Sequence, residues 1–191
     1  MHFPTQIFAL VLSLSAISLS APVHKRAGVL TKQTFNQFTV SAGISGNALA
    51  EVNAKFPVRA PLPLPFPPRT PHLTTPKINT NNLAAVDPAD LDIISKAAQI
   101  SEQAEVAAGG FNDALKGVSG AAKTALQNGK IKNKVLKLQT DVLRLQIQRA
   151  QGKAGLEGQI ATQQQKLATN VALDEKARGQ ESTGISFAGT D

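Results

Sequence analysis

The chain has no cysteine, no tryptophan and no tyrosine among its 191 residues. Without cysteine it can form no disulfide, and it has no thiol that could act as a nucleophile or as a metal ligand. Its aromatic residues are 8 phenylalanines, so a hydrophobic core must be built mainly from leucine, isoleucine, valine and alanine. There is also no Asn-x-Ser/Thr sequence, so N-glycosylation is not expected.

Histidine is almost as scarce, with three in the chain, and His72 alone lies beyond residue 26. A Ser-His-Asp hydrolase therefore lacks a credible base, and zinc chemistry lacks both cysteine and a histidine cluster. A two-carboxylate glycosidase is formally open, but sugar sites generally need aromatic stacking platforms, and a small aliphatic helical bundle offers little concave surface. The stretch 41–46 (SAGISG) has the glycines of a phosphate loop without its lysine. We predict a protein that is not an enzyme and that needs no cofactor and no metal.

The first 26 residues are predicted to be removed during export. Residues 7–19 (IFALVLSLSAISL) form an apolar run of signal-peptide length, shorter than the ~20 residues that a membrane span requires. Small residues precede a cleavage point after Ser20, so residues 1–20 are interpreted as a signal peptide. Residues 21–26 end in the dibasic pair Lys25-Arg26 and resemble the short pro-segments that kexin-type proteases remove. The mature chain is then residues 27–191, secreted and extracellular, with the cell wall as one destination.

Two short regions precede the helical part of the chain. In residues 27–56, Phe35, Phe38 and Val40 are predicted to form a packed edge, and residues 46–56 (GNALAEVNAKF) a short helix ended by Pro57. Residues 57–86 hold eight of the 11 prolines, so we predict a linker in polyproline II conformation. We interpret it as a spacer, because proline-binding domains are mostly intracellular. Its threonines are candidates for O-glycosylation: Thr70, Thr74, Thr75 and Thr80.

Residues 87–179 are predicted to form four helices, since apolar residues recur there at spacings of three and four. The first begins at 87–90 (DPAD), where Asp87 can cap the free amides, and ends at Gly109-Gly110. The second begins at Phe111 and is weakened by two glycines at 117 and 120. Asn128-Gly129 resembles a helix end, although the second helix could continue into the third.

The third helix has the most regular apolar pattern of the chain. Its buried stripe is predicted to comprise Ile131, Val135, Leu138, Val142 and Leu145, widened by Leu136, Leu143 and Ile147. A glycine turn at residues 152–155 leads to the fourth helix, whose weaker seam is Leu156, Ile160, Leu167, Val171 and Leu173. The fold class is therefore all-α: a small helical bundle with a C-terminal antiparallel αα-hairpin. Residues 180–191 are predicted to be a flexible tail.

Charge is distributed unevenly over the helical region. Residues 87–112 carry one basic and five acidic residues, residues 113–153 carry nine basic and two acidic, and residues 154–191 carry three basic and five acidic. One interpretation is internal, with a basic helix between acidic neighbours; the other is a surface for a polyanion, formed by Lys130, Lys132, Lys134 and Lys137. We favour the internal one, with the lysines mostly on a solvated face, where ion pairs contribute ~0–1 kcal/mol each. Changing all four lysines to glutamine is then expected to cost little stability.

The partner is predicted only by class. Nucleic acid is not expected, because the basic helix has neither arginine forks nor stacking aromatic residues. A membrane is not favoured, since the apolar face of this helix has an obvious partner within the chain. An unidentified protein or a cell-wall polysaccharide remains, and the oligomeric state stays open.

Two stretches, residues 44–57 (ISGNALAEVNAKFP) and 126–151 (LQNGKIKNKVLKLQTDVLRLQIQRAQ), resemble small secreted proteins of filamentous fungi. The resemblance covers most of the mature chain except residues 57–76 and implies an extracellular fungal protein, effector-like in some members. It implies no catalytic or binding residues. Our hypothesis is a secreted non-enzymatic protein that acts by binding at the cell wall or at a host or substrate surface. The alternatives are a structural wall or matrix component with a glycosylated linker and a cationic membrane-active protein.

Overall fold

The structure is a computed structural model that describes residues 28–57 and 80–190. The predicted signal peptide with Ser20, the dibasic pair Lys25-Arg26, and His72 with most of the proline-rich linker lie outside the described residues.

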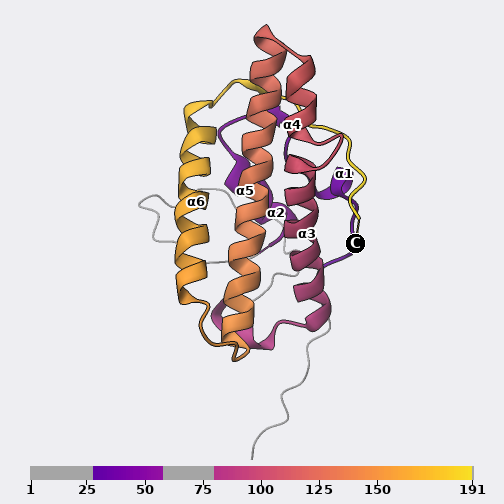
Figure 1. Cartoon of the computed structure of the whole chain (residues 1–191). Coiled ribbons are helices and arrows are strands. Elements are labelled where there is room, and N and C mark those ends of the chain that lie inside the picture. Colours follow the sequence, from indigo (N-terminus) through magenta and orange to yellow (C-terminus); the bar gives the residue numbers. More distant parts are fainter. Residues whose placement is uncertain (1–27, 58–79, 191) are drawn as a thin grey trace, which may run out of the picture.

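Three long helices lie side by side in one layer: α3 (Pro88–Val106), α5 (Gly120–Ala150) and α6 (Glu157–Lys176) (Figure 1). The central helix α5 packs against both of the others. The short helices α1 (Phe35–Phe38) and α2 (Ala48–Lys55) pack on one face of this layer, α1 against α3 and α2 against α5 and α6. The prediction of an all-α bundle is confirmed.

Helix α3 begins as its sequence predicts. The side chain of Asp87 accepts a hydrogen bond from the amide of Ala89 at 2.8 Å, and Pro88 occupies the first helical position. The preceding residues differ from the prediction of a linker through residue 86. Thr80–Ala85 form a short 3-10 helix, η1, and Val86 is buried.

The second predicted helix is wrong in its extent. Its first part is only one turn of α-helix, α4 (Phe111–Ala114), and one of 3-10 helix, η2 (Leu115–Gly117). The backbone is then extended at Val118 and Ser119, and α5 begins at Gly120 and runs for 31 residues. Asn128-Gly129 therefore lies inside a helix and does not end one. The break falls instead at the two glycines that weaken the predicted helix.

Asp113 of α4 connects the turn before this helix with η2 after it. The Asp113 carboxylate binds the Lys116 ammonium at 2.7 Å and accepts a hydrogen bond from the amide of Gly109 at 3.1 Å. These contacts lower the pKa of Asp113 below its usual value. The hydrogen bond from Lys116 is the largest cause, and the hydrogen bond from the Gly109 amide is the second largest.

The antiparallel hairpin of α5 and α6 is confirmed (Figure 1). The turn between them contains Gly152 with φ of +98°, a conformation that other residues rarely adopt. Of the predicted stripe on α5, Val135, Leu138 and Val142 are buried at 0%, 3% and 5% exposure, whereas Ile131 is only half-buried. The aliphatic face of α5 therefore turns inward.

The N-terminal segment supplies most of the aromatic part of the core. Phe35 and Phe38 meet edge to face with ring centroids 5.6 Å apart, and Phe38 meets Phe56 at 5.9 Å. The helix α2 follows as predicted and ends at Lys55, two residues before Pro57. Its N-terminus is capped from a distance, because the buried Asp174 of α6 accepts a hydrogen bond from the amide of Ala48 at 2.8 Å.

The C-terminal residues, expected to form a flexible tail, instead pack along the bundle. The strand β2 (Glu181–Ser182) pairs with β1 (Gly43–Ile44) in an antiparallel two-stranded sheet. The next residue donates its amide to the carbonyl of Ala125 in α5 at 2.9 Å. Further along, the ring of Phe187 meets the ring of Phe35 with centroids 5.9 Å apart. The tail thus joins the N-terminal segment to the middle of the bundle.

The tail crosses α5 at Gly129, and this crossing is testable. A β carbon at this residue would overlap the carbonyl oxygen of Thr183 and come within 3.1 Å of the carbonyl oxygen of Ser41. Glycine to alanine inside a helix normally stabilises by ~1 kcal/mol. Because both obstacles here are backbone atoms, we expect Gly129→Ala to destabilise the protein by about 1–3 kcal/mol in urea unfolding.

The matched control is Gly158→Ala in α6, where a β carbon meets nothing within 4 Å. This variant should be neutral or stabilising by up to ~1 kcal/mol. Equal stabilisation of the two variants would contradict the placement of the tail over Gly129.

Candidate functional site

Three of the four lysines predicted as a candidate site lie along one stripe of α5, at Lys130, Lys134 and Lys137. Their spacings of four and three residues place them on the side of α5 that faces α3. The Glu105 carboxylate of α3, 10% exposed, lies among them, with N–O distances of 3.8 Å, 3.2 Å and 3.5 Å. Glu102, one turn earlier, forms a second ion pair with Lys137. The acidic helix therefore neutralises the basic one across their interface.

Lys132 occupies a different environment, because it lies on the face of α5 that is turned into the protein. Its side chain is 0% exposed. The ammonium donates hydrogen bonds to the carbonyl oxygens of Ala42 and Ile44, both at 3.2 Å, and forms an ion pair with Glu51 of α2 at 2.9 Å. The stretch 41–46 thus binds an ammonium group through its carbonyls.

The prediction of a mostly solvated lysine face is therefore wrong. The structure supports the internal interpretation, in which a basic helix is paired with acidic neighbours. The lysine side chains are more deeply buried than the sequence led us to expect. The expectation that the quadruple glutamine variant loses little stability is also revised, since it would remove the buried Lys132 ammonium.

A polar groove of about 550 Å³ runs along α5 between α3 and α6. Ser95, Gln99 and Glu102 come from α3, and Gln163 and Lys166 from α6. The contribution of α5 is Lys137, Asp141 and Arg144, one helical turn apart, while the two apolar residues of the lining, Ala98 and Leu138, are buried. No phenylalanine is among the lining residues. This combination of side chains offers hydrogen-bond donors and acceptors of both charges.

Some charged side chains in this groove are paired with an opposite charge, and Lys166 is not paired within the described part of the chain. Arg144 binds Asp141 at 2.6 Å and reaches Gln148 at 3.3 Å, and Lys137 is held by the glutamates of α3. Lys166 is exposed and forms no ion pair within the described part of the chain. The groove therefore combines side chains held in fixed positions with one cation that a partner can approach.

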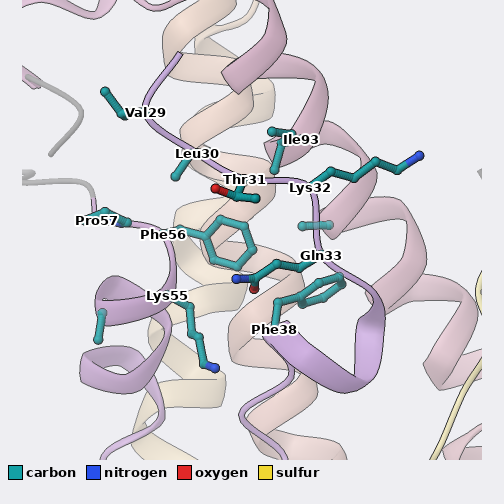
Figure 2. Close-up of a pocket in the computed structure, with 12 residues that line it drawn as sticks. Val29, Leu30, Thr31, Lys32, Gln33, Phe38, Lys55, Phe56, Pro57 and Ile93 are labelled. Atoms are coloured by element: carbon teal, nitrogen blue, oxygen red, sulfur yellow. The ribbon is translucent and has the colours of Figure 1, made fainter. Parts of the chain in front are cut away.

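A smaller cavity of about 200 Å³ lies between the extended segment 29–33 and the end of α2 (Figure 2). The rings of Phe38 and Phe56 line it together with Ile93 and Ala97 of α3. Lys55, at its edge, donates to the carbonyl oxygen of Gln37 at 2.8 Å. An apolar cavity of ~150 Å³ can hold a benzene molecule, so this one has room for a single small apolar group. It is too small to serve as the principal site of a larger ligand.

Within residues 28–57 and 80–190, no three histidine, cysteine, aspartate or glutamate side chains gather in a way that could hold a metal ion. Over the same ranges, no helix is long and apolar enough to cross a membrane.

The described residues form a small helical-bundle domain with a polar groove along α5. Residues 30–186 match the family model described as "Domain of unknown function (DUF8454)", and the chain belongs to this family. The matched range includes α1 and extends beyond β2, so both the N-terminal segment and the first part of the tail belong to the domain. No curated protein and no solved structure matches the chain significantly.

The sequence interpretation missed the residues that make the lysine environment and the groove. Glu102 and Glu105 were indicated only through the acidic charge of residues 87–112. Glu51 gave no signal, because 81 positions separate it from Lys132 and only the tertiary fold brings them together. The contribution of Lys166 was also missed, since it depends on how α6 lies beside α5.

The buried ammonium of Lys132 generates a stability prediction. Lys132→Met should destabilise the protein by about 3 kcal/mol in urea unfolding, because the enclosed ammonium is removed and two carbonyls and the Glu51 carboxylate lose their partner. Lys134→Met, on the half-exposed face of the same helix, should change stability by no more than ~1 kcal/mol. Similar small losses in both variants would show that position 132 is not enclosed.

Proposed function

We propose that this protein is an exported, non-enzymatic binding protein that acts at the cell wall or at a host or substrate surface. The proposal rests on one observation, which is that the charged side chains of the long helices pair with one another and leave a polar groove open between these helices. Four lysines of α5, Lys130, Lys132, Lys134 and Lys137, are paired within the protein, and an open polar groove lies between α3, α5 and α6. Binding through this groove is the activity that the arrangement supports best.

A protein segment fits this groove better than a polysaccharide does. Its lining offers amide groups from Gln99 and Gln163, a carboxylate from Glu102 and the cation of Lys166. These groups suit a polypeptide that presents both charges and free backbone amides. Sugars are usually bound against aromatic rings, and no aromatic side chain lines the groove. The partner we infer is therefore an extracellular protein.

Export is supported by the apolar run of residues 7–19 followed by Lys25-Arg26. The resemblance to small secreted fungal proteins supports a fungal origin and an effector-like role. A cationic membrane-active protein is supported less, since Glu102, Glu105 and Glu51 neutralise the lysines that it would use. A structural wall component remains the alternative from another class.

The groove can be tested by reversing its charge without touching the ion pairs of the fold. The variant Gln163→Glu/Lys166→Glu should reduce capture of the extracellular partner by at least ~10-fold, equivalent to ~1.4 kcal/mol, with an unchanged circular dichroism spectrum. The control, Gln165→Glu/Lys153→Glu, makes the same type of change at exposed positions outside the groove lining and should capture normally. Equal capture by both variants would exclude the groove as the binding surface.

Processing and destination can be read from the secreted protein itself. N-terminal sequencing of the exported chain should begin at Ala27, because cleavage follows Arg26, and Arg26→Gln should shift the start upstream. The wild-type protein should be recovered mainly from the culture filtrate. Retention in the wall after detergent extraction would favour the structural-component alternative instead.

A further inference from the structure

The small cavity beside the N-terminal segment has walls that the fold holds in place. One wall is the extended segment 29–33. Its start is attached to α3, because the buried carboxylate of Asp90 accepts hydrogen bonds from the amides of Val29 and Leu30 at 2.9 Å and 2.8 Å. A second wall is the end of α2, where the amide of Phe56 continues the helical hydrogen bonding. The cavity is therefore preformed.

The interior of this cavity is apolar and partly aromatic. The rings of Phe38 and Phe56 stand at an angle of 68° with centroids 5.9 Å apart, so they present both an edge and a face. Ile93 and Ala97 of α3 complete the apolar lining. Water is held well only where it finds about two to four polar partners, and this interior offers few. An apolar ring that displaces such water therefore gains affinity.

The charged side chains at the edge of the cavity are of one sign. Among the described residues that line it there are two lysines, Lys32 and Lys55, and no aspartate or glutamate. Lys32 points away from the two rings in Figure 2, so Lys55 is the cation that a ligand would meet. Its ammonium group donates to the carbonyl oxygen of Gln37 at 2.8 Å and has further protons to donate. The amide group of Gln33, which is turned toward the rings in Figure 2, adds a neutral donor.

We propose that this cavity binds a small aromatic acid with a single ring. The ring lies against Phe38 and Phe56, where edge-to-face contacts are available. The carboxylate lies at the edge of the cavity and accepts hydrogen bonds from Lys55 and Gln33. An apolar cavity of ~150 Å³ holds one benzene molecule, so a volume of about 200 Å³ has room for one ring and one carboxylate.

The experiment uses benzoate as the probe and follows the amide resonances of the protein by NMR. Benzoate should cause saturable shifts in residues 29–33 and 54–56, which form the two walls. Benzylammonium has the same ring but the opposite charge, and Lys55 repels it, so it should bind at least ~5-fold more weakly. Acetate, which lacks the ring, should cause no saturable shift over the same concentrations.

Two variants separate the roles of the ring and of the charge. Ala97 is buried and lines the cavity, so Ala97→Leu fills part of the space and should weaken benzoate binding by at least ~10-fold. Lys55→Gln removes the cation at the edge and should abolish the preference for benzoate over benzylammonium, with an unchanged circular dichroism spectrum. The matched control, Lys123→Gln, changes an exposed lysine of α5 outside the lining and should keep that preference.

Three results would overturn this proposal. The first is that benzoate causes no saturable shift in the two walls, and the second is that it binds no better than benzylammonium. The third is that a folded Ala97→Leu variant binds benzoate as the wild type does. If that variant does not fold, the comparison of Lys55→Gln with Lys123→Gln decides, because an equal preference in both excludes the edge of the cavity as the carboxylate site. The groove is tested separately, since its lining shares no residue with this cavity.

Discussion

The fold depends on neutralising the ammonium groups of its central helix. The elements α2, α3, α6, η1 and β2 all pack against α5, so the lysines of this helix have little open water to face. Glu105 forms ion pairs with three of these lysines, at positions 130, 134 and 137. Lys132 is enclosed by a carboxylate and two carbonyl oxygens. The pairing of α3 with α5 and of α2 with α5 is therefore specified by charge as well as by apolar contact. Such buried pairs help to select one arrangement more than they add net stability.

Much of the architecture follows from local patterns in the sequence. The apolar spacing of α5 and α6, the capping residues 87–88 and the glycine turn after residue 150 each depend on neighbours within a few positions. These patterns predict the hairpin, the start of α3 and the short helix before Pro57, and the structure has all of them. The position of the break before α5 was predicted wrongly, because Asn128-Gly129 has the local signature of a helix end. Residue 129 is a glycine for another reason: the backbone of Thr183 and Ser41 lies where a β carbon would be.

The environments of the charged groups could not be predicted in the same way. Whether a lysine faces water or a carbonyl depends on residues that are far away in the sequence, such as Glu51 for Lys132 and the amides of Val29 and Leu30 for Asp90. Helical periodicity places Lys132 three residues before the buried Val135, which hints at an inward orientation. It does not indicate what the ammonium would meet there. The same limit applies to the groove, which exists only because α6 lies on the far side of α5 from α3.

The pairing of β1 with β2 has a consequence for how this protein reaches its native state. It joins residues 43–44 to residues 181–182, so the native arrangement closes almost the entire domain into one long loop. Contacts between such distant positions form late, because the entropy of closing the loop opposes them until other elements are in place. A growing chain on the ribosome cannot make this pairing before residues 181–182 have been synthesised. The two strands can therefore pair only after all the helices of the described chain have been synthesised.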